Sequence, residues 1–153
     1  MDELRLPSIS QRKEIVATPK RIFKNAHAYH INSISLNCDG ETFLSSDDLR
    51  INWWNQDRPD TCFNVVDIKP PMMEELNRVI TTAEFHPLHC NMLLYAASTG
   101  AIMLADTRKS ALCENSARLF EAEGCSSNAY FADIISSISA AKFSACGRYI
   151  GKF

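Results

Sequence analysis

Two histidine pairs are the residues whose spacing could bind a metal ion. His27 with His30, and His86 with His89, follow an H-x-x-H spacing, and a cysteine comes directly after the second pair. On a helix, such a pair could ligate one zinc ion from a single face. Pro87 and the alternating residues around the pairs favour strands and loops instead. We therefore interpret these histidines as ordinary loop residues and expect no metal site.

Asp47 and Asp48 could form a pair of catalytic carboxylates. Side chains of adjacent residues in a strand point to opposite faces, so the two carboxylates would not meet one substrate. We expect Asp47 to stabilise its own turn, while Asp48 faces a surface. The sequence also has no nucleophile elbow, phosphate-binding loop, dinucleotide fingerprint or H-E-x-x-H motif. These features predict a non-catalytic protein without a cofactor.

The cysteines and the distribution of apolar residues indicate the cellular compartment of the protein. Six cysteines without a C-x-x-C pair favour buried, reduced thiols over a zinc site or a disulfide scaffold. No window approaches the ~20 apolar residues of a membrane-spanning helix, and residues 1–5 show no apolar core of an export signal. We expect a cytoplasmic protein, or one that is also nuclear, with no membrane partner.

The formal net charge of -2 conceals an uneven distribution. Basic side chains are in excess over residues 1–27, and acidic ones are in excess over residues 39–75. The acidic stretch repels nucleic acid phosphates and favours a basic partner. A solvated acidic face without a partner is the plain alternative.

Short alternating stretches predict the strands that position these residues. Ile34 and Leu36 alternate with small polar residues, which places both on one face of a strand. Asp39-Gly40 is typical of a tight hairpin turn because both residues tolerate a positive φ. Strands are then expected over residues 42–45 and 49–53, the last of which carries Leu49, Ile51 and Trp53 on one apolar face. Trp53 and Trp54 are interpreted as core residues.

The same order of strands recurs further along the chain. Residues 83–87, 93–96 and 101–106 repeat residues 34–37, 43–45 and 49–53, and a third copy begins at residues 141–144. Three or four short strands recurring every ~40–60 residues are typical of β-propeller blades. We predict an all-β fold, an incomplete propeller of about two full blades and part of a third. The blades are expected at about residues 26–66, 78–110 and 134–153.

Three connecting stretches do not follow this pattern. Residues 1–25 mix prolines, hydroxyls and charges without a period, which predicts an extended arm or a hairpin segment before the partial propeller of residues 26–153. Two prolines followed by good helix formers in residues 70–76 predict a short helical turn on one rim. Residues 120–130 are expected to form a polar loop.

Several long runs resemble the WD-repeat regulatory B subunit (55-kilodalton class) of protein phosphatase 2A. The runs are Asn-Ala-His-Ala-Tyr-His-Ile-Asn-Ser-Ile-Ser (25–35), Asp-Gly-Glu-Thr-Phe-Leu-Ser-Ser-Asp-Asp-Leu-Arg-Ile-Asn (39–52), Phe-Asn-Val-Val-Asp-Ile-Lys-Pro (63–70), Met-Glu-Glu-Leu (73–76), Ala-Glu-Phe-His-Pro (83–87), Ser-Ala-Leu-Cys (110–113) and Ile-Ile-Ser-Ser-Ile-Ser (134–139). The resemblance covers about residues 20–150, roughly the middle third of such a subunit, with a looser match at residues 4–7.

This resemblance implies a regulatory and targeting subunit that bridges the phosphatase scaffold and catalytic subunits and selects phosphoprotein substrates. It implies an acidic groove for substrates with basic segments, whose residues fall on Tyr29, His30, Asp48, Met73 and Leu76. It also implies an arm that grips the scaffold. The scaffold-binding residues would be Leu4, Arg5, Leu6, Pro7, Arg12 and Lys13.

The chain departs from the family pattern at three places. Trp53-Trp54 replaces the usual Leu-Trp, Met103 replaces a basic residue, and Arg78 stands near a usual acidic residue. Arg78 could weaken the attraction for basic substrates. A truncated, impaired form of such a subunit would show the same motifs. The alternative function is a generic WD-repeat scaffold that binds proteins unrelated to the phosphatase.

Overall fold

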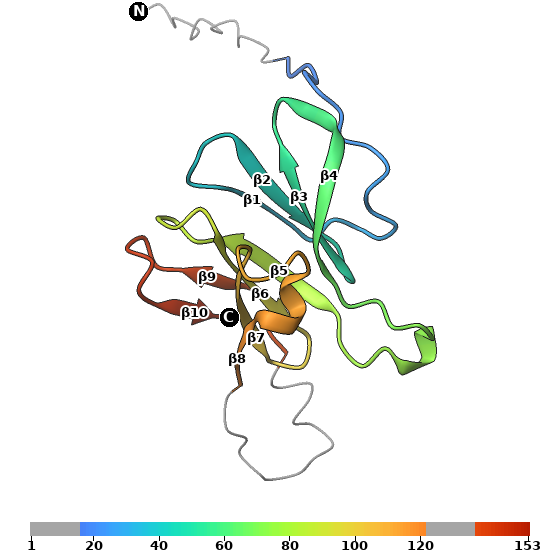
Figure 1. Ribbon diagram of the computed structural model, residues 1–153, viewed down its shortest axis with the longest axis vertical. Coiled ribbons are helices and arrows are strands. Elements are labelled where there is room, and N and C mark those ends of the chain that lie inside the picture. Colours follow the sequence, from blue (N-terminus) through green and yellow to red (C-terminus); the bar gives the residue numbers. More distant parts are fainter. Residues whose placement is uncertain (1–15, 122–136) are drawn as a thin grey trace, which may run out of the picture.

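Two four-stranded antiparallel sheets and a two-stranded hairpin form the structure, a computed structural model that describes residues 16–121 and 137–153 (Figure 1). The first sheet contains β1 (Ser33–Leu36), β2 (Thr42–Ser46), β3 (Arg50–Asn55) and β4 (Arg58–Asp67). The second contains β5 (Ile80–Phe85), β6 (Met92–Ala97), β7 (Ile102–Asp106) and β8 (Arg118–Phe120), and the hairpin contains β9 (Ala141–Phe143) and β10 (Ile150–Lys152). Two short 3-10 helices, η1 (Met73–Glu75) and η2 (Cys113–Ser116), lie in the connections.

Each sheet is a meander in which strands pair in chain order. In Figure 1 the first sheet stands above the second, and the red hairpin lies beside the second sheet. This arrangement confirms the predicted all-β fold with two full propeller blades and part of a third. The helical turn expected within residues 70–76 is also present, as η1.

The sequence pattern did not reveal the outermost strand of either blade. β4 is mostly exposed from Arg58 to Phe63, where it carries Pro59, a residue that sheets tolerate at an edge, and it is buried at Val65 and Val66. All three residues of β8 are exposed. An edge strand with solvent on both faces needs no apolar alternation, so the period-two signal is missing there.

The first hairpin turn is longer than Asp39-Gly40. The backbone N–H of Asn37 donates to the carbonyl of Thr42, and only Gly40 has a positive φ, 71°. Asp39 contributes its side chain instead, since its Oδ1 accepts the N–H groups of Glu41 and Thr42 at 2.9 Å. The predicted hairpin turn is present, but the expected positive φ is found only at Gly40, because the Asp39 side chain closes a wider loop.

The main apolar core fills the space between the two sheets. It contains Leu44, Ile51, Val65 and Val66 from the first sheet, and Phe85, Leu93, Tyr95 and Met103 among the residues of the second. A smaller cluster of Leu94, Ala96, Ile102, Ile138 and Ala141 joins the second sheet to the hairpin. Trp53 packs against the main core, 6.0 Å from Phe85 between ring centroids, so Ile51 and Trp53 do share an apolar face.

Ile34 and Leu36 share a face of β1, but that face is the outer one. Their exposed fractions are 66% and 68%. The opposite face carries Ser33 and Ser35, whose hydroxyl oxygens accept the backbone N–H groups of Ala83 and Phe85 at 2.9 and 3.0 Å. The polar side chains of this strand therefore bind the next blade, where β5 would otherwise have unpaired N–H groups.

A buried chain of polar side chains crosses the first blade. The indole N–H of Trp54 donates to Ser45 Oγ at 2.8 Å, and Ser45 Oγ lies 2.6 Å from His27 Nε2. His27 Nδ1 lies 2.8 Å from the carboxylate of Asp47, which is 1% exposed. The second oxygen of Asp47 accepts the N–H groups of Leu49 and Arg50, so Asp47 stabilises its own turn as predicted.

The cysteines are less buried than the sequence suggested. Of the five in the described residues, Cys113 is buried and Cys90 is half-buried, while Cys38, Cys62 and Cys146 are exposed. Cys38 and Cys146 lie in hairpin turns and Cys62 lies in the exposed edge strand, so the strand core does not cover them. The expectation of buried thiols is wrong for these three.

We expect Asp47→Ala to destabilise the protein by about 2–4 kcal/mol. The change removes two turn hydrogen bonds and leaves His27 without its partner in a buried site. Asp48→Ala is the matched control, because the Asp48 side chain is only half-buried, and it should change the free energy of unfolding by less than ~0.5 kcal/mol. Urea unfolding of both variants measures the difference. Equal free energies of unfolding for the two would contradict this role of Asp47.

The phenol of Tyr95 makes stability depend on alkaline pH. Burial, followed by the negative charge of Glu114, raises the pKa of Tyr95 to about 12. In the unfolded chain the phenol ionises near its ordinary pKa of ~10, so the unfolded state binds fewer protons above that pH. The contribution of neutral Tyr95 is thus fully present below pH ~10 and is lost as the pH rises toward ~12. Tyr95→Phe should flatten the alkaline fall in unfolding free energy, whereas the exposed Tyr149→Phe should not.

Candidate functional site

The predicted groove residues come from three segments that are bonded to one another at Asn32, Asp48 and Ile80. The carbonyl of Asp48 accepts the N–H of Ile80 at 2.8 Å, and the side chain of Asn32 donates to the carbonyl of Ile80 at 2.7 Å. These two bonds hold the β2–β3 turn, the segment before β1 and the end of the β4–β5 connection against one another. The rim, as we call this region, comprises residues 29–32, 47–49 and 73–80.

The rim presents its predicted contact residues to solvent. Tyr29 and Met73 are 44% and 45% exposed, and His30 is exposed too. Asp48 and Leu76 are half-buried. No hydrogen bond or ion pair within the described part of the chain joins these five side chains to one another. They therefore form a surface and not an enclosed site.

η1 gives the rim its shape. Pro70 and Pro71 have no N–H group to continue the β4 ladder, and the chain leaves the sheet there. The N–H of Glu75 then donates to Met72 and that of Leu76 donates to Met73, which closes a single helical turn. None of the residues of η1 is buried. The turn lies on the right in Figure 1, and its acidic and apolar side chains are exposed.

The acidic side chains of the rim are not neutralised. Within the described residues, the carboxylates of Asp48, Glu74 and Glu75 make no hydrogen bond and no ion pair. Asp67 and Glu114 differ, since Arg50 binds Asp67 at 3.0 Å and Arg78 binds Glu114 at 2.9 Å. The rim thus keeps three free negative charges beside apolar Met73 and Leu76.

Arg78 is less unfavourable for a basic ligand than its position suggested. Its guanidinium is bound to Glu114 in an ion pair whose side chains are 35% and 31% exposed. The carboxylate of Glu114 therefore compensates the positive charge of Arg78 within the protein.

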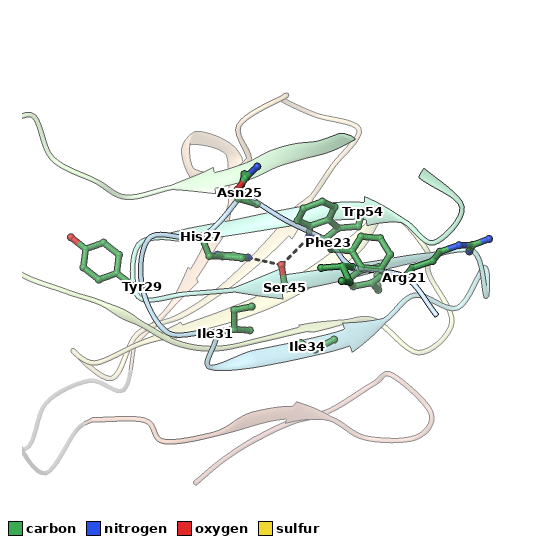
Figure 2. Close-up of a pocket in the computed structure, with 12 residues that line it drawn as sticks. Arg21, Phe23, Asn25, His27, Tyr29, Ile31, Ile34, Ser45 and Trp54 are labelled. Carbon is green, nitrogen blue, oxygen red and sulfur yellow. Dashed lines mark hydrogen bonds between the residues drawn. The ribbon is translucent and has the colours of Figure 1, made fainter. Parts of the chain in front are cut away.

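A separate pocket lies on the outer face of the first sheet (Figure 2). Its volume is about 500 Å³, and its lining includes Phe23, Phe43, Trp54 and Ile34. The rings of Phe23 and Trp54 meet edge to face with centroids 5.3 Å apart. Tyr29 alone of the predicted groove residues also lines this pocket. The lining offers mainly apolar contact. It also includes His27 and Ser45, whose polar atoms are engaged with each other, with Asp47 and with Trp54 in the buried chain described above.

Sequence reasoning missed Phe23 and the role of His27. His27 was interpreted as an ordinary loop histidine, whereas both of its ring nitrogens are engaged, by Asp47 and Ser45. The signal available in the sequence was the combination of a histidine, a turn aspartate, a strand serine and a tryptophan in one blade. In the second blade Ala105 occupies the position of Trp54, so the repeat itself did not reveal the pattern.

The predicted scaffold-binding residues Leu4, Arg5, Leu6, Pro7, Arg12 and Lys13 lie outside the described residues. Among residues 16–121 and 137–153, no group of three or more His, Cys, Asp and Glu side chains is arranged to hold a metal ion. No helix within these two ranges has the length and apolar character that a membrane span requires.

Comparison with known proteins points to one family, although no protein-family model matches the chain. The phosphatase 2A regulatory subunit phr2AB of Dictyostelium discoideum is 59% identical over 148 residues, which are 95% of this chain and 31% of that protein. The PP2A regulatory B subunit of Schizosaccharomyces pombe is 57% identical over 150 residues, 97% of this chain and 32% of that protein. The beta isoform of the 55 kDa regulatory B subunit of Carassius auratus is 56% identical over 149 residues, 96% of this chain and 34% of that protein.

The chain therefore spans about a third of the length of the curated relatives that it matches. The matches run through nearly all of the chain, including both blades and the rim, and the blades have the strand order that the repeats predicted. On these grounds the chain, which corresponds to about one third of the length of such a subunit, belongs to the family of 55 kDa regulatory B subunits of protein phosphatase 2A.

Proposed function

We propose that this chain is a non-catalytic regulator of protein phosphatase 2A that binds the phosphatase complex and presents substrates to it. The observation that carries this proposal is the identity of 54–59% to regulatory B subunits along at least 95% of the chain. The all-β blades support it, because propellers bind other proteins at the rims of their blades.

The rim is the proposed substrate surface. Free carboxylates at Asp48, Glu74 and Glu75 would attract a basic segment of a phosphoprotein, and they would raise its association rate through their combined field. Met73 and Leu76 would supply apolar contact for a side chain next to the basic residues. Tyr29 and His30 complete the proposed surface from the segment that precedes β1.

Asp48 is the central residue of this surface. Its backbone is fixed by the hydrogen bond to Ile80 and by the neighbouring Asp47 turn, so only its side chain has to become ordered when a ligand binds. A pre-organised charge loses little conformational entropy on binding. Truncating one partner of a desolvated interface pair costs ~2–5 kcal/mol, against ~0–1 kcal/mol for an exposed pair.

The basic N-terminal residues are the proposed contact with the phosphatase scaffold. Of the basic residues near this end, Arg21 is bound within the protein, because its guanidinium donates to the carbonyl of Gln56 at 2.6 Å and lies 2.9 Å from Asp57. The proposed scaffold-binding residues lie upstream of it in the sequence. Their excess positive charge suits an acidic partner surface.

The intact chain should retain the scaffold and catalytic subunits in a pull-down, and removal of residues 1–20 should weaken that binding. The deletion removes proposed scaffold contacts but none of the strands from β1 to β10, so the circular dichroism spectrum should keep the signal of these strands. Unchanged retention after the deletion would reject the scaffold assignment. Failure of the intact chain to retain either phosphatase subunit would favour the generic interaction scaffold.

Asp48→Lys should reduce the affinity for a basic phosphopeptide at least tenfold, which corresponds to ~1.4 kcal/mol. The substitution replaces an attractive charge with a repulsive one at the centre of the rim. Glu41→Lys is the matched control, because it makes the same charge change in the turn at the opposite end of β2. Isothermal titration of both variants, at equal ionic strength, separates a local effect from a change in net charge. Equal losses of affinity in the two would place the binding surface elsewhere.

A further inference from the structure

Two cysteines from neighbouring blades face each other. Cys38 lies in the β1–β2 turn and Cys90 lies in the β5–β6 turn, 52 positions apart in the sequence, and their Sγ atoms are 2.6 Å apart. Cys38 is exposed and Cys90 is half-buried, so small molecules reach the pair from solvent. Among the described residues, no other two cysteine sulfurs are in contact.

A single buried side chain holds the backbone of both cysteines. Asn37 is 5% exposed. Its Oδ1 accepts the N–H of Cys38 at 2.8 Å, and its Nδ2 donates to the carbonyl of Cys90 at 3.0 Å. The two thiols are therefore kept in register by a hydrogen-bonded bridge between the blades, independently of the contact between their sulfur atoms.

Each turn is also fixed from within its own blade. In the first turn, Asp39 accepts two backbone N–H groups. In the second, His86 is 6% exposed and its Nδ1 accepts the N–H groups of Leu88 and His89 at 3.1 and 3.0 Å. Neither turn has to reorganise for the two sulfurs to meet, which is the usual obstacle to joining two cysteines.

We propose that Cys38 and Cys90 form a reversible disulfide that fastens the first blade to the second, by exchange with a low-molecular-weight disulfide such as oxidised glutathione. One cysteine thiolate attacks the oxidant, which creates a mixed disulfide and releases one glutathione thiolate. The other cysteine then loses its proton, attacks the protein sulfur of the mixed disulfide and releases the second glutathione. The two protein thiols lose two electrons, and the two glutathione molecules receive these electrons and the two thiol protons.

The contact also affects the reactivity of Cys38. The hydrogen bond with Cys90, followed by burial, raises the pKa of Cys38 to about 11. A raised pKa lowers the fraction of Cys38 that is thiolate, which is the nucleophile in exchange, so the contact slows attack by Cys38.

The test uses the purified chain of residues 1–153, first reduced and then incubated with oxidised glutathione. Non-reducing peptide mapping should find one dominant intramolecular link, between Cys38 and Cys90, with the loss of two hydrogens from the intact mass. The link closes a long loop and should raise Tm by about 5–10 °C. Dithiothreitol should reverse both changes.

Cys38→Ser and Cys90→Ser should each abolish the link and the rise in Tm, whereas Cys62→Ser, which removes another exposed cysteine, should keep both. The same oxidation in concentrated urea should lose the preference for this pair, because its selectivity comes from the folded turns. The comparison with and without urea uses only the unchanged chain, so it does not depend on whether a variant folds. Glutathione adducts on both cysteines without a link, dominant links at other cysteines or between chains, or an equal yield of the Cys38–Cys90 link in urea would each overturn the proposal.

Discussion

The buried carboxylate of Asp47 is the constraint on which the first blade depends. A carboxylate that is 1% exposed is stable only when its oxygens are fully engaged, and here they receive two backbone N–H groups and the ring of His27. His27 belongs to the segment before β1, so the carboxylate joins that segment to the β2–β3 turn. The segment in turn carries Phe23, whose ring packs on Phe43 and Trp54.

The geometry of the rim depends on the bonds of the Asp47 carboxylate. Because Asp47 fixes the β2–β3 turn, Asp48 has one backbone position and its carbonyl can pair with Ile80. That pairing fixes the end of the connection that carries η1 to the β2–β3 turn. The two adjacent aspartates thus differ in role: Asp47 is buried and structural, and Asp48 keeps a free carboxylate at the surface. The difference follows from the alternation of side chains at a strand end.

Much of the fold was predictable because inner strands of the blades alternate in polarity. The edge strand β8 and the first part of β4 were not, since exposure on both faces removes the period-two signal. The burial of β1 was misjudged for a different reason: Ser33 and Ser35 face the next blade, and hydroxyls can fill an interface when they accept backbone hydrogen bonds. Apolar alternation shows which residues share a face, but not which face is covered.

The candidate site was only partly within reach of the sequence. Asp48, Met73 and Leu76 were assigned to the groove from the family resemblance. Sequence spacing alone would not have assigned them to one site, because the rim depends on long-range bonds to Ile80. The ion pair between Arg78 and Glu114 could not be predicted from local sequence patterns either, because the two residues are 36 positions apart. Trp53, where the family usually has leucine, has a buried indole N–H with no partner among the described residues, which is a cost that leucine avoids.

Among residues 16–121 and 137–153, the hydrogen bonds between a side chain of one blade and the backbone of another all start from a side chain of the earlier blade. Ser33 and Ser35 of β1 accept N–H groups of β5, and Glu84 of β5 accepts the N–H of Phe143 in β9 at 2.8 Å. Each inner strand therefore supplies side-chain acceptors to its successor and receives none of these bonds back. The row of blades is therefore directional, because each folded blade presents bonding groups on which the next blade can order. Blades that emerge one after another during synthesis can dock in the order in which they are made.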